Sequence, residues 1–140
     1  MRRLRIILAE DNEADVLLVR YALQAHNVLH QLHVIADGAK AIDFIGKIGK
    51  PDSTPCPDLM LLDLNLPKAD GTEVLRELRK HPQCSSTPVI IVTSSDAPKD
   101  RARVAELGIS HYFTKTSDWD AFMRLGEVVM RVTEQEPPKL

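Results

Sequence analysis

Residues 59–71 read LMLLDLNLPKADG. Four apolar residues form a run of strand length, which stops at Asp63 and gives way to a loop containing a proline and a glycine. Continuous apolar runs of this length are typical of strands that are buried on both faces, as in a parallel sheet. Two further runs share this character, at residues 6–9 and 89–92, and weaker strand candidates lie at residues 32–35 and 110–113.

Between these runs, apolar residues recur every three or four positions, which predicts helices. Five such segments begin near Ala14, Ala41, Val74, Ala102 and Phe122. Glycine and proline residues, which interrupt helices, follow several of these segments, and Ser117 with Asp120 can form a capping box before the last one. Five alternating strands and helices imply right-handed crossovers and a flavodoxin-like α/β fold, with one parallel sheet in the order 2-1-3-4-5.

Size and composition suggest one water-soluble domain. With 140 residues we expect a single domain with its core at about residues 4–133 and a frayed tail at 134–140. A net charge of −2 gives no basis for nucleic-acid binding, and no apolar segment is long enough for a membrane span. We therefore expect a cytoplasmic protein, and we interpret Cys56 and Cys84 as free thiols rather than as a disulfide.

Polar residues follow the predicted strands at their carboxyl ends, where ligands bind in open α/β sheets. They are Glu10, Asp11, Asp63, Thr93, Ser94 and Lys115. Three carboxylates in one cleft repel one another unless a cation lies among them, and an all-oxygen ligand set suits Mg²⁺. A lysine and a hydroxyl at the same place suit a phosphoryl group. Each residue alone could be a turn or capping residue, so the prediction rests on their combination.

The sequence resembles the bacterial response-regulator receivers over nearly its whole length. The matching stretches are ILAEDN at residues 7–12, LLDLNLPKADG at 61–71, IVTS at 91–94 and YFTK at 112–115. Within that family it looks most similar to the small stand-alone regulators that pair with phytochrome-type sensor kinases. The stretch EDNEADV at residues 10–16 and a proline-rich insertion before the third strand carry this finer likeness.

The resemblance implies a role for each residue of the predicted site. Asp63 would accept a phosphoryl group from a phosphohistidine of a sensor histidine kinase. The Mg²⁺ ligands would be Asp11, Asp63 and the backbone carbonyl of Asn65, with Glu10 acting through a water. The phosphoryl group would be held by Lys115, by the Thr93 hydroxyl and by the backbone N–H groups of Leu64 and Ser94. Such a protein is not an enzyme in the usual sense, although it would carry phosphotransfer and autodephosphorylation chemistry.

The resemblance also implies a conformational switch and a surface through which the protein signals to its partners. Movement of Thr93 toward the phosphoryl group would let Tyr112 rotate, which would change the face made by the fourth helix, the fifth strand and the last helix. Downstream proteins would bind there, or a homodimer could form with the participation of Trp119. One position departs from the family, because Thr116 replaces the proline that usually follows the lysine. Since a cis bond before a non-proline residue costs about 3–4 kcal/mol, we predict a trans Lys115–Thr116 bond.

Three other functions fit less well. A Mg²⁺-dependent phosphohydrolase that uses an aspartyl phosphate needs a second Asp where Asn65 stands, and a flavodoxin-like electron carrier needs a phosphate loop after the first strand. A degenerate receiver that binds partners without phosphorylation would not need the full set of acidic, hydroxyl and lysine residues. We therefore expect a two-component response regulator that signals through protein contacts.

Overall fold

The computed structural model describes residues 3–50 and 55–134, and it confirms the predicted fold class. Five parallel strands form one sheet in the order β2-β1-β3-β4-β5. The strands are β1 (Leu4–Ala9), β2 (His30–Ile35), β3 (Leu59–Leu62), β4 (Val89–Thr93) and β5 (His111–Thr114). All four residues of β3 are fully buried, as expected for a strand that is covered on both faces.

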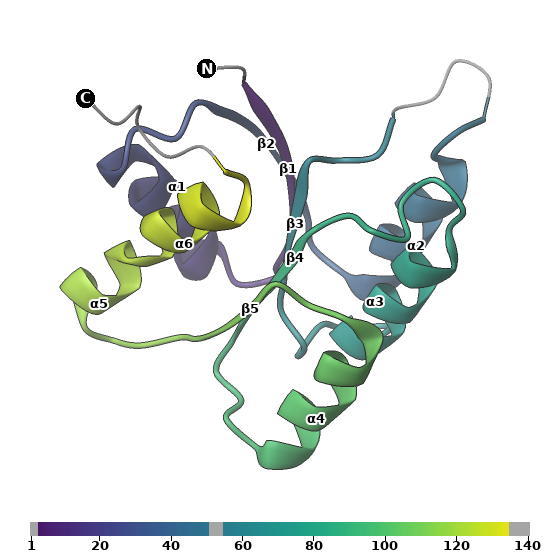
Figure 1. The fold of residues 1–140 in the computed structure, drawn as a ribbon. Coiled ribbons are helices and arrows are strands. Elements are labelled where there is room, and N and C mark those ends of the chain that lie inside the picture. Colours follow the sequence, from purple (N-terminus) through teal and green to yellow (C-terminus); the bar gives the residue numbers. More distant parts are fainter. Residues whose placement is uncertain (1–2, 51–54, 135–140) are drawn as a thin grey trace.

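Helices cover both faces of the sheet (Figure 1). One face carries α1 (Glu13–Ala25), α5 (Trp119–Met123) and α6 (Leu125–Val132), and the other carries α2 (Gly38–Lys47), α3 (Gly71–Lys80) and α4 (Pro98–Leu107). Successive side chains of a strand point to opposite faces, so the sheet separates two apolar cores. In β1, for example, Ile6 and Leu8 pack toward α1, whereas Ile7 and Ala9 pack toward α2 and α3.

The last predicted helix is two helices in the structure. A turn at Arg124 separates α5 from α6, and the Arg124 N–H donates to the Ala121 carbonyl at 3.3 Å. The expected capping box is also wrong, because the N-cap residue is Asp118, whose carboxylate accepts from the Ala121 N–H at 3.1 Å. Apolar periodicity continues across the break, so the sequence pattern gave no sign of it. At Gly126 a Cβ would lie 2.3 Å from the Ala22 carbonyl oxygen, so α6 approaches α1 where only glycine fits.

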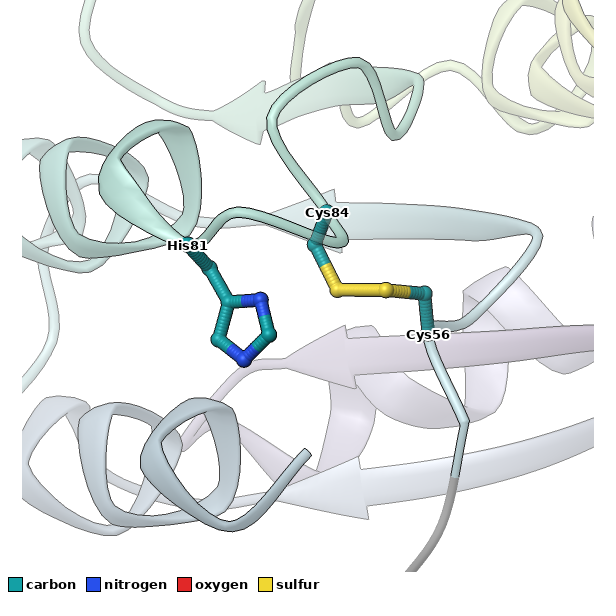
Figure 2. Close-up of side chains that lie close together, drawn as sticks. All are labelled: Cys56, His81 and Cys84. Carbon is teal, nitrogen blue, oxygen red and sulfur yellow. A yellow bond between two sulfur atoms is a disulfide. The ribbon is translucent and has the colours of Figure 1, made fainter. Parts of the chain in front are cut away.

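The interpretation of the two cysteines as free thiols is wrong. Cys56 and Cys84 form a disulfide with a Cα–Cα distance of 5.7 Å, which lies inside the range that a disulfide can span (Figure 2). The fold brings the segment before β3 beside the connection between α3 and β4, although 28 residues separate the two cysteines in sequence. Spacing along the chain therefore concealed their proximity.

Two other expectations are only partly covered by the structure. Residues 51–54 of the proline-rich insertion and residues 135–140 of the predicted tail lie outside the described residues. Among the helices that are described, none has the length and apolar character needed to cross a membrane.

Candidate functional site

The carboxyl edge of the sheet brings the predicted acidic residues together. Glu10 directly follows β1, and Asp63 directly follows the neighbouring β3. Both side chains are buried, with 2% and 4% of the residue exposed, whereas Asp11 is exposed. One carboxylate oxygen from each of the three residues lies within 4.8 Å of the others. This set can hold a hard cation, because it offers only oxygen and is open to solvent on the Asp11 side.

Lys115 supplies a positive charge inside this acidic cluster. Its Nζ lies 2.7 Å from Glu10 Oε1 and 2.9 Å from Asp63 Oδ2, and only 12% of its side chain is exposed. Burial alone would lower the pKa of Lys115, but hydrogen bonds to its carboxylate partners outweigh burial and raise that pKa above its usual value. Burial also raises the pKa of Glu10 to about 7, and the hydrogen bond from Lys115 only partly opposes this shift. The cluster therefore favours the charged form of Lys115, whereas burial favours the neutral form of Glu10.

Asp15 is a fourth carboxylate at the site, and the sequence interpretation missed it. Its Oδ2 lies 2.7 Å from the Lys115 Nζ, although the two residues are 100 positions apart. Asp15 reaches the site because α1 begins at the end of the Glu10–Asp11 loop, where the Asn12 side chain caps the helix by accepting from the Asp15 N–H at 3.0 Å. The signal was present, since an acidic residue in the first turn after that loop must lie near it.

The loop after β3 fixes the second oxygen of Asp63. The backbone N–H of Asn65 donates to Asp63 Oδ1 at 3.1 Å, so both carboxylate oxygens of Asp63 have a partner. The loop then folds back, and the Gly71 N–H donates to the Leu64 carbonyl at 3.0 Å. A Cβ at Gly71 would lie 2.2 Å from the carbonyl oxygen of Asp63. Glycine is therefore required where α3 begins beside the acidic residue.

Thr93 and Tyr112 are connected through Ser95. Thr93 is fully buried at the end of β4, and its hydroxyl oxygen accepts from the Ser95 N–H at 3.4 Å and from the Asn65 side-chain amide at 3.5 Å. The Tyr112 hydroxyl donates to the Ser95 carbonyl at 2.8 Å, and its ring lies 4.2 Å from the Arg101 guanidinium carbon. The sequence paired Thr93 with Tyr112 but did not identify Ser95 as the residue between them.

Comparison with known proteins identifies the family. The profile described as the response regulator receiver domain matches residues 6–125. The chain belongs to this family. It is 40% identical to the response regulator Rcp1 of Synechocystis sp. over 111 residues, which are 79% of this chain and 76% of that protein. These findings confirm the resemblance drawn from the motifs.

Solved structures support the finer likeness to phytochrome-associated regulators. The phosphorylated cyanobacterial phytochrome response regulator RcpA superposes with a TM-score of 0.85 at 31% identity, covering 97% of this chain and 98% of that one. The Mn²⁺-bound form of Rcp1 gives a TM-score of 0.83 at 34% identity, covering 98% and 99% of the two chains. This chain is thus a receiver domain of the two-component response regulators, and it is similar to Rcp1 and RcpA.

The Lys115–Thr116 peptide bond is trans, as predicted. The Lys115 N–H donates to the Thr93 carbonyl at 2.7 Å, which fixes the lysine beside the end of β4. The Thr116 hydroxyl then accepts from the Asp118 N–H at 3.1 Å, one residue before α5. A side-chain turn thus replaces the usual proline, and the Lys115 amine still reaches the acidic cluster.

Trp119 lies on the side of α1 rather than on the side of α4. The residue is 53% exposed, and its ring packs against Tyr21, with 5.6 Å between the ring centroids. In Figure 1, α5 and α1 share one face of the sheet, and α4 lies on the other. The side chain therefore extends the surface of α1.

Proposed function

We propose that this receiver accepts a phosphoryl group on Asp63 from a phosphohistidine of a sensor histidine kinase. The observation that carries the proposal is the Lys115 ammonium, held 2.9 Å from Asp63 within a buried acidic cluster. The likeness to phytochrome response regulators supports a kinase of the phytochrome type as the donor. We also place the chain in the cytoplasm, the compartment predicted from the sequence.

The donor set favours Mg²⁺ as the cation of this site. Asp11 and Asp63 would bind the ion directly with the backbone carbonyl of Asn65, and Glu10 would act through a water. All of these ligands are oxygens, and such sets select hard cations over soft ones. A bound Mg²⁺ would supply charge neutralisation for the transferred phosphoryl group. The Mn²⁺-bound form of Rcp1 supports the binding of a divalent ion by this chain.

Phosphoryl transfer needs little from the protein besides positioning and charge. A P–O bond would form to the Asp63 carboxylate as the P–N bond to the donor imidazole breaks, and the bonding electron pair would stay with that imidazole nitrogen. The Asn65 N–H and the Lys115 ammonium already hold the two Asp63 oxygens. Lys115 would then pair with a phosphoryl oxygen. The remaining donors would be the Thr93 hydroxyl and the backbone N–H groups of Leu64 and Ser94.

Ser95 gives the proposed switch a physical path. If the Thr93 hydroxyl turns toward the phosphoryl group, it leaves the Ser95 N–H, and the Ser95 carbonyl that holds Tyr112 is free to move. Tyr112 and the neighbouring Arg101 would then change the surface formed by α4, β5 and α5. We propose that downstream proteins, or a second copy of the receiver, recognise this surface in one of its two forms.

Acetyl phosphate tests the proposal without knowledge of the kinase. With Mg²⁺ present, the wild-type chain should gain one phosphoryl group by mass spectrometry, in a form that is stable to mild acid and labile to hydroxylamine, as expected for an acyl phosphate. Asp63→Asn should gain none, whereas Asp43→Asn, at an exposed position on α2, should behave as the wild type. Multiple-turnover hydrolysis of general phosphate esters would support a phosphohydrolase instead. Failure to modify the wild type would support a degenerate receiver.

A further inference from the structure

A second group of metal-ligating side chains lies at the opposite, amino edge of the sheet. Cys56 precedes β3, while His81 and Cys84 lie in the connection from α3 to β4. One imidazole nitrogen and the two sulfur atoms lie within 4.8 Å of one another. Figure 2 shows the imidazole beside the disulfide, with its Nδ1 edge turned toward Cys84. Cys84 is fully buried, and the other two side chains are partly buried.

The hydrogen bonds of His81 fix which ring nitrogen carries the proton. The Gln83 backbone N–H donates to Nδ1 at 3.1 Å, so Nδ1 is unprotonated and its lone pair accepts a hydrogen bond that a metal bound at Nδ1 would replace. Nε2 lies 3.0 Å from the Ile48 carbonyl oxygen and must therefore carry the hydrogen and donate it. Metal-bound histidines commonly donate their other ring N–H to a backbone carbonyl, which orients the ring. His81 is thus already in the tautomer that a metal bound at Nδ1 requires.

We propose that, when the disulfide is reduced, Cys56, His81 and Cys84 form a binding site for Zn²⁺. Two thiolates and one imidazole nitrogen are a ligand set that zinc prefers, and a water would complete a tetrahedron. Thiolates also distinguish this site from the carboxylate cluster at the other edge, because they select softer cations than Mg²⁺. The ends of α2 and α3 meet here, at Ile48 and His81, and the carboxyl ends of helices favour a positive charge.

A dithiol reductant supplies the electrons that convert the disulfide into two thiols. Two electrons and two protons pass from the reductant to the Cys56–Cys84 bond, which becomes two thiols, while the reductant becomes a disulfide. Zinc binding then releases the two thiol protons, since the ligands are thiolates. Two sulfur ligands of a tetrahedral zinc, each at about 2.3 Å from the ion, lie about 3.8 Å apart. The Cα atoms, at 5.7 Å, leave room for that separation through rotation of the two side chains.

Cobalt is the probe for this site, because thiolate ligation gives Co²⁺ an intense charge-transfer absorption that oxygen ligands do not give. The wild-type chain would be reduced with a metal-free phosphine and titrated with Co²⁺ in excess Mg²⁺, which occupies the carboxylate cluster. We expect one Co²⁺ per chain with the charge-transfer band, displacement of that band by Zn²⁺, and no band from the oxidised chain. Zinc should also raise the melting temperature of the reduced chain and leave that of the oxidised chain unchanged.

Three variants assign the ligands. Cys56→Ser, at a partly buried position, should remove most of the charge-transfer intensity while the circular dichroism shows a folded chain. His81→Gln should keep the band and weaken Co²⁺ binding at least about tenfold. His33→Gln, at an exposed histidine on β2, is the matched control and should bind as the wild type. The absence of the band from the reduced wild type, or unchanged Co²⁺ affinity in His81→Gln, would overturn the proposal.

Discussion

Replacing Lys115 by methionine tests the electrostatics of the carboxyl edge. Methionine keeps the length and apolar stem of the side chain but removes the ammonium that contacts Glu10, Asp15 and Asp63 at 2.7–2.9 Å. Without metal, the variant must then keep several carboxylates close together with no cation. We expect a large loss of stability in the absence of Mg²⁺ and recovery of most of that loss when Mg²⁺ is added.

The size of the loss of stability follows from the burial of the ion pairs that Lys115 forms. Removing one partner of a buried ion pair costs about 3–5 kcal/mol. The lower value applies here because the Asp15 side chain is 23% exposed and can be rehydrated. For 140 residues, an unfolding entropy of about 2.1 cal/mol/K per residue converts about 3 kcal/mol into a melting temperature lower by about 10 °C. Mg²⁺ at a hundred times its dissociation constant returns about 2.7 kcal/mol.

Urea unfolding at pH 7.5, followed by circular dichroism with either a chelator or Mg²⁺, measures both effects. The pH is suitable because the pKa of Lys115 is raised in the folded chain. Its stabilising contribution is therefore present below the usual lysine pKa of 10.5 and is lost only as the pH rises above it. Lys80→Met is the control, since Lys80 is 64% exposed and pairs only with Glu77 within α3 among the described ion pairs. A loss below about 1 kcal/mol in Lys115→Met, or no greater rescue by Mg²⁺ than in the wild type, would refute the reasoning.

Three further predictions concern other parts of the receiver. With chelator present, reduction of the Cys56–Cys84 disulfide should lower the free energy of unfolding by about 3.6 kcal/mol, because the bond closes a loop of 28 residues. A change of less than about 1 kcal/mol in urea unfolding would contradict this prediction. Tyr112→Phe removes a hydrogen bond to a main-chain carbonyl and should cost about 1 kcal/mol in the same assay. Gly71→Ala forces a Cβ against the carbonyl oxygen of Asp63, and it should cost about 1–3 kcal/mol and slow acetyl phosphate labelling. Gly46→Ala, whose Cβ meets nothing within 4 Å, should do neither, and equal labelling rates in the two variants would contradict the close contact.

The sequence was sufficient for the sheet because three of its strands have an unambiguous pattern. The buried runs of β1, β3 and β4 lack polar residues, and the polar residues that end them mark the carboxyl edge. The last helix was predicted less well, since apolar periodicity depends on side-chain direction and passes through the turn at Arg124 without a change. Close backbone contacts, such as that of Gly126 with α1, are not encoded in periodicity.

The site was predicted where each residue has a strand end to mark it. Asp63 and Lys115 follow strands, and their contact confirms that these strand ends converge. The contact of Asp15 with Lys115 and the link that Ser95 makes between Thr93 and Tyr112 were missed. Both residues lie one step beyond the strand ends, and their contacts depend on how α1 begins and how the chain leaves β4. The two cysteines were misinterpreted for the same reason, since nothing in their local sequence indicates that the two connecting segments lie side by side.

The strand β3 separates two sites of different chemistry. Asp63 follows its carboxyl end, and Cys56 precedes its amino end. Four strand residues span about 13 Å, which exceeds the Debye length of about 8 Å at physiological ionic strength. Charge at one edge is therefore weakly felt at the other edge through solvent. The strand between them is fully buried and tightly packed, so a change at one edge reaches the other only if it moves that core. Oxygen ligands at one edge and, once the disulfide is reduced, sulfur ligands at the other can thus respond to different cations within one small fold.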